Sequence, residues 1–357
     1  MDDVVAIAER IARRDHGGKR GPFTLEIYPT LVCNLACGFC DTTIRTHRDP
    51  DELSAARQLA LVDEAADLGA QRVMVLGGGE PLLAPHAPAL LRRVKERGLV
   101  GTLTTNGTLL TAAIRQLLLA IAWDEVHVSV DGATPATHDR LRGRAGAFRK
   151  TLSSVCRLRA GRDAAGRSLP RIVLHCVLTR NNVDELPALV RLAGAVGADA
   201  VELDALVAYR PEQHTFALGV GELARLPHRL GEAMAVAVEV GVRTNFDRFL
   251  AGSTVQRGSK APPAGTGSGY AKAPCLKPWH HLVVAADGHL SPCCVLTGEG
   301  ESVASTSLGA AWEGSAYLTN LRRGMLSGTP GGRCAECSEN ILVHERNIRA
   351  ALPKISV

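Results

Sequence analysis

The order of apolar and polar positions along the chain alternates between two periods. Six short apolar runs of strand-like composition are each followed by a segment in which apolar residues recur at helical spacing. The strand-like runs cover residues 25–28, 72–76, 101–105, 125–130, 171–178 and 200–206. The helical segments cover residues 54–68, 88–97, 111–122, 147–159, 183–196 and 222–240. Strands that alternate with helices predict an α/β protein with a parallel sheet and right-handed crossovers.

Six strand–helix units fit a partial (βα)6 TIM-like barrel, although periodicity alone also allows a doubly wound sheet of the flavodoxin type. In both folds the carboxyl ends of the strands meet at one edge, where ligands bind. Polar or glycine-rich turns follow the first five strands, at residues 33–40, 77–81, 104–107, 129–132 and 181–182. These turns predict a single site at that edge.

The pattern outside the barrel divides the chain into further parts. Residues 1–23 form a leader helix, with helical spacing over 2–15, and a loop; the barrel covers 24–250. Residues 251–274 are a flexible linker rich in Gly, Pro and Ser. Residues 275–357 then predict a small C-terminal domain, which contains a β-hairpin of strands 281–285 and 289–291 and a helix over 312–326. The chemistry of this small domain depends on its cysteines.

Composition narrows the class of protein. The chain has 357 residues and is 46% hydrophobic, which is enough for a sizeable core. Its net charge is +5 without a basic cluster, so no nucleic-acid partner is expected. No apolar run reaches membrane-spanning length and the N-terminus has no signal-peptide core, so we expect a cytoplasmic protein with no membrane partner. Ten cysteines in such a protein are better explained as metal ligands than as disulfides.

Three of these cysteines follow the first strand. Cys33, Cys37 and Cys40 have the spacing Cys-x3-Cys-x2-Cys, which places three thiolates within eight residues. Three thiolates can hold three irons of a 4Fe–4S cluster and leave one iron open. The alternative is a zinc knuckle or a set of buried thiols, but zinc sites normally use paired cysteines or histidines, and no such pair lies near Cys33.

This motif, with Phe39 before its last cysteine, resembles the signature of the radical SAM superfamily. Gly78-Gly79-Glu80-Pro81 is similar to the second motif of that family. The resemblance covers nearly the whole chain from Thr24 and implies the partial barrel. It also implies that S-adenosylmethionine (SAM) binds the open iron and is cleaved by one electron to a 5′-deoxyadenosyl radical. A flavodoxin- or ferredoxin-type donor would supply that electron.

The resemblance also implies which residues contact SAM. Gly78, Gly79 and Glu80 would hold its amino group, Ser129 its ribose or carboxylate, and Arg142 its carboxylate, while Phe39 would pack beside the adenine. Asn106 follows the third strand, and Asp131 ends the fourth on the same side as Ser129, so both are candidate contacts. Each of these residues has a simpler explanation as a turn residue, a cap or a surface charge.

The remaining cysteines gather near the C-terminus. The order of Cys275, a hairpin that ends at Cys293, and then Cys334-Ala-Glu-Cys337 provides four ligands, and it resembles a SPASM or twitch domain with one auxiliary 4Fe–4S cluster. Cys294 could replace Cys293, and a four-cysteine zinc ribbon is the alternative for this module. Cys156 and Cys176 are expected to be buried apolar residues.

A cysteine-ligated auxiliary cluster favours net oxidation of the substrate, because it can accept the electron that a substrate radical loses. We expect a dehydrogenase-type enzyme acting on a small polar metabolite, such as an aminosugar or cyclitol. The alternatives are a maturase of ribosomally synthesised peptides, with Cys294 as the hydrogen donor if it epimerises, and a non-catalytic zinc or iron–sulfur protein. The side chains that could line the pocket are His280, His281, Tyr209, Arg210, Glu212 and Asp204.

Overall fold

The computed structural model describes residues 2–15, 21–40, 51–208, 210–250, 273–337 and 347–352. The predicted linker therefore lies almost wholly outside the described residues, as does Tyr209. None of the described helices is both long and apolar enough to span a membrane.

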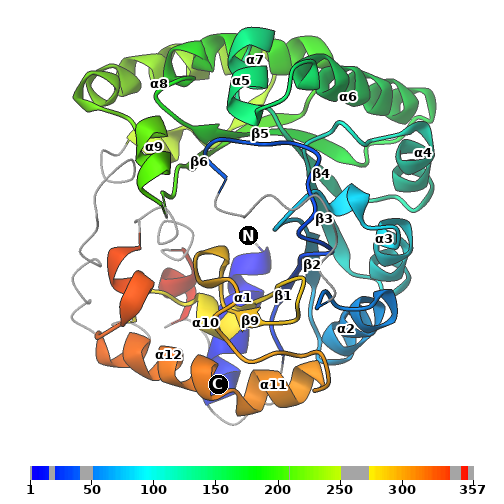
Figure 1. Ribbon diagram of the computed structural model, residues 1–357, viewed down its shortest axis with the longest axis vertical. Coiled ribbons are helices and arrows are strands. Elements are labelled where there is room, and N and C mark those ends of the chain that lie inside the picture. Colours follow the sequence, from blue (N-terminus) through cyan, green and yellow to red (C-terminus); the bar gives the residue numbers. More distant parts are fainter. Residues whose placement is uncertain are drawn as a thin grey trace.

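A parallel sheet curves around the centre of the molecule (Figure 1). All six predicted strands are present, and each pairs in parallel with its sequence neighbour. Their bounds are β1 (Thr24–Ile27), β2 (Arg72–Val75), β3 (Val100–Thr105), β4 (Glu125–Ser129), β5 (Arg171–Leu178) and β6 (Ala200–Ala205). A short unpredicted strand, β7 (Arg243–Thr244), extends the sheet beyond β6. This is the arrangement of a partial TIM-like barrel, so the predicted fold class is confirmed.

Helices cover the outer face of the sheet. They are α2 (Ala55–Asp67), α3 (Ala87–Glu96), α4 (Ala112–Ala120), α5 (Pro135–Arg142), α6 (Ala147–Ala164), α7 (Leu186–Val196) and α8 (Val220–Val240), with α9 (Asp247–Leu250) at the end of the barrel. Side chains cap three of their N-termini: Ser54, Thr111 and Thr134 each accept a hydrogen bond from a backbone N–H in the first turn. Helix α5 was not predicted.

The two faces of the sheet differ in chemistry. Leu25, Val73, Val126 and Leu174 face the helices and belong to the main apolar core. Since successive strand residues point to opposite faces, their neighbours line the inside of the barrel. Those inner positions include many polar residues: Glu26, Arg72, Thr102, Glu125, His127, Arg171, His175, Glu202 and Asp204. The interior is therefore suited to a polar ligand.

The C-terminal domain continues the barrel sheet. Its hairpin consists of β8 (His281–Val284) and β9 (Leu290–Ser291), preceded by α10 (Lys277–His280). Strand β8 pairs in parallel with β1, from Thr24 opposite His281 to Ile27 opposite Val284. In the described part of the chain, one sheet therefore runs in the order β7-β6-β5-β4-β3-β2-β1-β8-β9. The sequence predicts the hairpin but not its pairing with β1.

The predicted helix over 312–326 is wrong in one respect, because two helices occupy this region. They are α11 (Leu308–Gly314) and α12 (Ala316–Ser327). The residue between them, Ser315, has an extended backbone, and its hydroxyl accepts a hydrogen bond from Leu318 N–H. This N-cap starts a new helix at the point where the apolar pattern alone predicts continuity.

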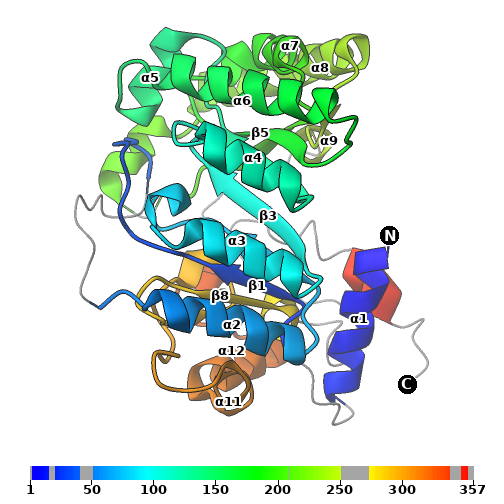
Figure 2. The same ribbon diagram turned by 90° about the vertical axis from the view of Figure 1, so that its right-hand side faces the viewer.

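The leader helix α1 (Asp2–Asp15) packs against the C-terminal domain. Ala8 and Ile11 of α1 are completely buried in an apolar cluster with Leu276, Trp279 and other residues of that domain. Figure 2 shows α1 beside the short helical segment at residues 347–352, which adds Ile348 to the same cluster. The two ends of the chain therefore help to cover the base of the domain that carries the C-terminal cysteines.

The ten cysteines, all among the described residues, form no disulfides with one another. The prediction for Cys176 is confirmed, since its side chain has no exposed surface, but the prediction for Cys156 is wrong because Cys156 is exposed. The buried side of α6 passes through Thr151, Val155 and Leu158, which leaves Cys156 on the solvent side.

Iodoacetamide is expected to alkylate Cys156 in the native protein and to leave Cys176 unmodified. Burial raises the pKa of the Cys176 thiol far above its usual value, so both thiolate content and access protect it. Peptide mass mapping after brief alkylation checks this, with denatured protein as the control in which both cysteines react. Equal labelling of the two in native protein would contradict the placement of α6.

Candidate active site

The loop after β1 carries the first three cysteines and arches over the carboxyl ends of the strands toward β6 (Figure 1). Cys33 Sγ accepts a hydrogen bond from Leu35 N–H at 3.4 Å, and Cys40 N–H donates to Cys37 O at 3.2 Å. These turns fold the loop on itself. Burial raises the pKa of the Cys33 thiol, and the charges of Cys37 and Cys40 add to this effect. We call residues 31–40 the cluster loop.

The C-terminus of α5 holds the middle of the cluster loop. Ala36 N–H donates to Arg142 O at 3.1 Å, and Gly38 N–H donates to Leu141 O at 3.3 Å. Gly143 ends the helix in the left-handed conformation, with φ of 63°. A Cβ at Gly143 would lie 2.1 Å from Ala36 O, so only glycine permits this contact. The unpredicted helix α5 is therefore part of the site.

A 3-10 helix after β6, η3 (Pro211–Phe216), holds the end of the cluster loop. Gln213 donates to Cys40 O at 2.7 Å, and Arg210 donates to the same oxygen at 2.8 Å. The ring of Phe216 meets the Phe39 ring edge-on at a centroid distance of 6.1 Å. The last cysteine is thus fixed by residues that lie about half the chain away in sequence.

The glycines of the second motif pack against the cluster loop. A Cβ on Gly78 would lie 2.3 Å from the Leu31 side chain, and a Cβ on Gly79 would lie 2.2 Å from Val32 O. The next residue, Glu80, donates its N–H to the same Val32 oxygen at 2.8 Å. The glycines therefore bring the loop after β2 into direct contact with the cluster loop.

The carboxylate of Glu80 joins two loops at the site. It is buried and accepts hydrogen bonds from Thr105 Oγ1 at 2.6 Å, from Asn106 N–H at 2.8 Å and from Leu82 N–H at 3.2 Å. Burial raises its pKa, against the effect of these donors. A carboxylate has about four acceptor positions, so one remains for a ligand. Glu80 therefore acts first as a clamp between the loops after β2 and β3.

Asn106 links the loop after β3 to the cluster loop. Its Nδ2 donates to Asn34 Oδ1 at 2.9 Å, and Asn34 Nδ2 in turn donates to Thr108 Oγ1 at 2.8 Å. Asn106 Oδ1 also accepts from Thr108, so its side chain is well satisfied within the protein. The geometry favours a role for Asn106 in holding the loop, and its predicted contact with SAM stays a prediction.

Arg142 lies at the centre of the charges near the thiols. Its guanidinium forms an ion pair with Asp131 Oδ2 and a hydrogen bond of 3.7 Å to Cys37 Sγ, and it lies over the Phe39 ring at 5.6 Å. Although burial opposes its charge, Asp131 and Cys37 keep the pKa of Arg142 above its usual value. Asp131 has no exposed surface and also accepts from Val177 N–H at 2.8 Å. Asp131 therefore orients Arg142. A direct contact between Asp131 and SAM is not favoured.

Ser129 and the predicted pocket residues have different surroundings. Ser129 ends β4 and has no side-chain hydrogen bond to any described residue, so its hydroxyl is available to a ligand. Asp204 accepts from His175 Nε2 at 2.8 Å inside the barrel, and Glu212 is exposed.

His281 is buried and bonded to Glu26 at 2.9 Å, while neither ring nitrogen of the buried His280 has a hydrogen bond within the described part of the chain. Both histidines are thus core residues at the β1–β8 junction.

The auxiliary cysteines gather around Cys334. Cys334 packs with Cys275 on the apolar cluster that includes α1, and with Cys293 on a second small cluster, and it feels the charge of Cys337. Cys293 is buried and Cys294 is exposed. The burial of Cys293 favours it as the ligand. Burial, followed by the charges of Glu26 and Cys294, raises the pKa of Tyr28.

Both sets of thiols fit iron–sulfur clusters by the chemistry of their donors. A cubane binds each cysteine to a different iron. Each set provides the thiol donors that such a cluster requires, within partly apolar walls. Cys33, Cys37 and Cys40 could hold one cluster, and Cys275, Cys293, Cys334 and Cys337 the other.

Iron loading of the metal-free protein is expected to become faster as the pH rises from about 7 to about 9. Burial raises the pKa of the Cys33 thiol to about 11 and of the Cys334 thiol to about 12, and only thiolates bind iron. The thiolate fraction rises roughly tenfold per pH unit below the pKa. Anaerobic stopped-flow absorbance measures the rate, with fully alkylated protein as the control. A rate that does not depend on pH would contradict this expectation.

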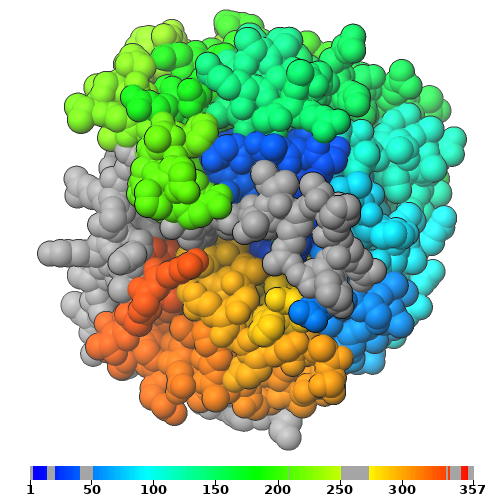
Figure 3. Space-filling model, viewed as in Figure 1, coloured from blue at the N-terminus to red at the C-terminus, as the bar shows by residue number. Residues whose placement is uncertain are grey.

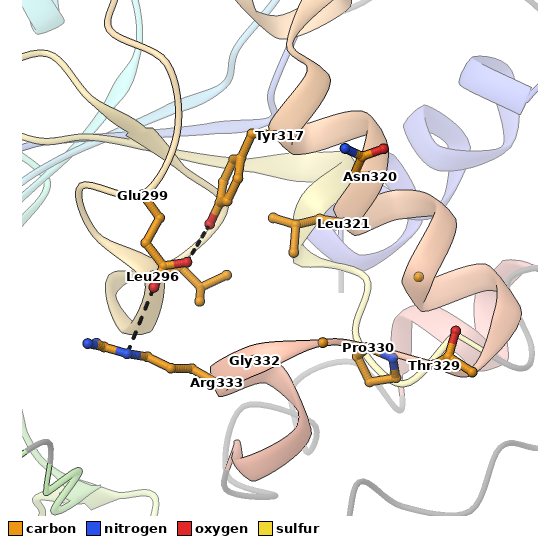
Figure 4. A pocket seen from close by; sticks show the side chains of 11 residues that line it. Leu296, Glu299, Tyr317, Asn320, Leu321, Thr329, Pro330, Gly332 and Arg333 are labelled. Carbon is orange, nitrogen blue, oxygen red and sulfur yellow. Dashed lines mark hydrogen bonds and ion pairs between the residues drawn. The ribbon is translucent and has the colours of Figure 1, made fainter.

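A cavity of about 350 Å³ lies beside the auxiliary cysteines, between α12 and the 3-10 helices η5 (Cys294–Leu296) and η6 (Gly332–Glu336) (Figure 4). At this cavity the Tyr317 hydroxyl donates a hydrogen bond to Glu299 Oε2 at 3.3 Å, and Glu299 Oε1 lies 3.8 Å from Arg333 Nε.

Figure 3 shows that the segment with the first three cysteines (blue) lies between the barrel rim (green) and the C-terminal domain (gold and orange).

Several residues of the site were not predicted. Asn34 and Gln213 fix the cluster loop by hydrogen bonds, and His175 projects into the barrel. Asn34 could have been found, because it lies within the cysteine motif. Gln213 gives no signal in the sequence, since its role depends on η3 folding back onto the cluster loop.

Comparison with known proteins gives the family. The model of the radical SAM superfamily matches residues 27–193, and that of the SPASM iron–sulfur cluster-binding domain matches residues 275–338. The PqqA peptide cyclase of Granulibacter bethesdensis is 30% identical over 82% of this chain and 74% of its own length. The AdoMet-dependent heme synthase of Methanosarcina barkeri is 26% identical over 82% of each chain.

Two solved structures share the fold. Streptococcus suis SuiB bound to S-adenosylmethionine has a TM-score of 0.66 and 18% identity, over 88% of this chain and 71% of SuiB. The enzyme anSMEcpe with bound AdoMet and the Cp18Cys peptide has a TM-score of 0.62 and 16% identity, over 93% and 98%. The chain binds SAM and 4Fe–4S clusters, one of them auxiliary, and it belongs to the radical SAM superfamily as an enzyme with a C-terminal SPASM domain.

Proposed function

We propose that this radical SAM enzyme modifies a peptide by net oxidation. Bound SAM and its cluster supply a 5′-deoxyadenosyl radical, which takes a hydrogen atom from an unactivated carbon of the substrate. The single observation that carries the peptide assignment is the 30% identity to a PqqA peptide cyclase over 82% of this chain. The prediction of an aminosugar or cyclitol substrate draws no support from the relatives described above.

The residues of the site have separate tasks in this proposal. Cys33, Cys37 and Cys40 bind the first cluster, and the fourth acceptor position of Glu80, with the carbonyls of Gly78 and Gly79, receives the amino group of SAM. Arg142 keeps its charge at the pH of the cell and pairs with the SAM carboxylate in addition to Asp131. Ser129 offers its hydroxyl to the ribose, and Phe39 lies beside the adenine.

The second site serves the oxidation. Cys275, Cys293, Cys334 and Cys337 hold the auxiliary cluster, which accepts the electron that the substrate radical loses. Cys294, exposed beside this site, is the hydrogen donor if the enzyme epimerises its substrate instead. The initial electron comes from a flavodoxin- or ferredoxin-type protein in this proposal, and the enzyme works in the cytoplasm.

A tetrapyrrole is the second candidate substrate, because the heme synthase of Methanosarcina barkeri is similar over 82% of this chain. The peptide and tetrapyrrole candidates can be distinguished by which of the two compounds stimulates the cleavage of SAM.

The test is anaerobic release of 5′-deoxyadenosine by cluster-loaded protein with SAM and a reductant. Three additions are compared: a mixture of synthetic peptides of random sequence, porphyrin carboxylates, and a mixture of aminosugars and cyclitols. Stimulation by peptides, with a product two hydrogens lighter by mass, supports the proposal. Stimulation by porphyrins alone would shift the assignment to the second candidate. A variant with Cys33, Cys37 and Cys40 replaced by alanine is the control for contaminating activity.

A further inference from the structure

Two histidines project into the barrel just below the proposed SAM site. His127 lies on β4 and His175 on β5, while their neighbours Val126, Val128, Leu174 and Cys176 are buried on the helix side. Strand residues alternate between faces, so both imidazoles face the barrel interior. In the pairing of β4 with β5, His175 lies directly opposite Ser129, the proposed ribose contact. His175 is therefore in the layer of the sheet immediately beside the site.

Each histidine is bonded to a carboxylate. His175 Nε2 lies 2.8 Å from Asp204 Oδ2 on β6, and His127 Nε2 lies 2.7 Å from Glu125 Oε1 on β4. The two ring centroids are 6.1 Å apart. The side chain of His175 is 19% exposed, so a ligand in the barrel can reach it. If Nε2–H donates to Asp204, the free electron pair is on Nδ1, as a base requires.

A purely structural role does not explain the His175–Asp204 pair. Asp204 is 67% exposed, and an ion pair at such exposure contributes little to the stability of a protein. The contacts that fix β5 to β6 are the backbone bonds of six paired residues and the apolar residues on the opposite face. Instead, the pair fixes the direction of one ring nitrogen of His175, and the other side of the imidazole faces the barrel interior.

The charges around His175 set its proton affinity. Burial lowers its pKa, but Asp204, followed by Asp131 and Glu202, outweighs burial and raises the pKa above the usual value. The titratable and charged groups that face it are Glu125 and His127 from β4, Arg171 from β5, Glu202 and Asp204 from β6, and Asp131 after β4. The charges around His175 therefore favour its protonated form, which makes the neutral ring a stronger base.

We propose that His175, oriented by Asp204, is the base that takes the proton from the substrate when its radical is oxidised. This role rests on the proposed function. By then the substrate carbon has lost one hydrogen atom, and bound SAM with its cluster would supply the radical that removes it. The substrate radical then loses one electron to a one-electron acceptor of the iron–sulfur class and one proton, from a neighbouring N–H, O–H or S–H, to His175. The product has lost two hydrogens in total, and His175 passes the proton to solvent.

The first test needs no substrate. Diethyl pyrocarbonate modifies neutral imidazoles, and the pH dependence of modification at His175, followed by peptide mass mapping of the cluster-loaded protein, gives its pKa. Asp204→Asn should lower that midpoint, because the carboxylate that favours the protonated ring is gone. An unchanged midpoint would show that Asp204 does not orient or charge His175, which overturns the proposal.

The second test separates hydrogen abstraction from proton removal. His175→Gln should still release 5′-deoxyadenosine with the stimulating compound from the three mixtures, but form product at least ~100-fold more slowly. His127→Gln is the matched control, because it removes the other carboxylate-bonded imidazole, which lies on β4. This variant should keep the normal ratio of product to 5′-deoxyadenosine. Asp204→Asn should move the acid limb of product formation to lower pH, in parallel with the modification midpoint.

The outcomes distinguish the two proposals. If no compound stimulates 5′-deoxyadenosine release by the unmodified enzyme, the proposed function fails, and the role of His175 fails with it. If release and product formation are both normal in His175→Gln, only the role of His175 is overturned. Imidazole added to His175→Ala should restore product formation, and failure of this rescue together with normal binding of SAM would indicate a structural role instead.

Discussion

Replacing Arg142 with methionine is expected to destabilise the protein by about 3–5 kcal/mol, the usual cost of leaving one partner of a buried ion pair alone. The abandoned partner is Asp131, which has no exposed surface and whose carboxylate otherwise accepts, among the described residues, from Val177 N–H. Methionine preserves the length and most of the apolar volume of the side chain, so the loss reflects charge rather than a cavity. Denaturant unfolding of the metal-free protein measures the free energy.

Two further variants show whether charge is the cause. The double variant Asp131→Asn, Arg142→Met should be more stable than Arg142→Met, because it no longer buries an unpaired carboxylate. Arg140→Met is the matched control on the same helix, since Arg140 is exposed, and it should change stability little. A double variant no more stable than Arg142→Met would refute the ion-pair explanation.

Arg142→Met should also lower the iron content of the reconstituted protein. The Arg142 guanidinium donates to Cys37 Sγ, and its backbone carbonyl accepts from Ala36 N–H. Only the first of these contacts is lost in Arg142→Met, so cluster assembly separates the effect of the side chain from that of α5 as a whole. Loss of iron from the first site with retention at the auxiliary site is the expected pattern.

Most of the barrel could be predicted because each strand and helix carries its own pattern. The outward faces of strands such as β2, β4 and β5 are apolar, and helices such as α3 and α7 bury one regular stripe against the sheet. Helix α5 is the exception. Its buried residues are Thr137, His138, Leu141 and Arg142, three of which are polar. Leu141 and Arg142 lie against the cluster loop. Thr137 donates to Glu185, and His138 accepts from Asp131 N–H, so the hydrophobic pattern cannot reveal this helix.

Long-range pairing could not be predicted either. His281 on β8 contacts Glu26 on β1 across 255 positions of sequence. A four-residue apolar strand fits the edge of many sheets, and the sequence does not specify which edge it joins. This pairing attaches the auxiliary cysteines to the strand that leads into the cluster loop.

The site itself was predicted by motif, and the structure changes the reason for the motif. The sequence suggests that the glycines admit a ligand and that Glu80 binds it. In the structure the space beside Gly78 and Gly79 is filled by the cluster loop, and Glu80 already accepts three hydrogen bonds. A glycine that faces a ligand and one that faces a neighbouring loop have the same appearance in sequence. The neighbour becomes known only when the chain is folded.

Gly79→Ala is therefore expected to abolish SAM binding, whereas Gly78→Ala should weaken it only moderately. The added Cβ at Gly79 would lie 2.2 Å from Val32 O, a backbone atom that also accepts the Glu80 N–H. Relief of this overlap requires the loop to move away from the cluster loop, which breaks that hydrogen bond and displaces Glu80. At Gly78 the added Cβ meets the tip of the Leu31 side chain, which can change rotamer. Equilibrium dialysis with labelled SAM measures both affinities in the cluster-loaded protein.

Gly231→Ala provides the control for a glycine replaced without crowding. Gly231 lies inside α8, and apart from its chain neighbours and its own helix backbone no atom of the described residues comes within 4 Å of an added Cβ. Alanine should therefore leave SAM binding unchanged and raise stability by up to about 1 kcal/mol. The ranking of the three variants carries the argument. Equal loss of SAM affinity in Gly78→Ala and Gly79→Ala would mean that the ligand, rather than the Val32 carbonyl, occupies the space beside these glycines. If Gly79→Ala loses far more SAM affinity than the other two variants, contact between the two loops forms the SAM site.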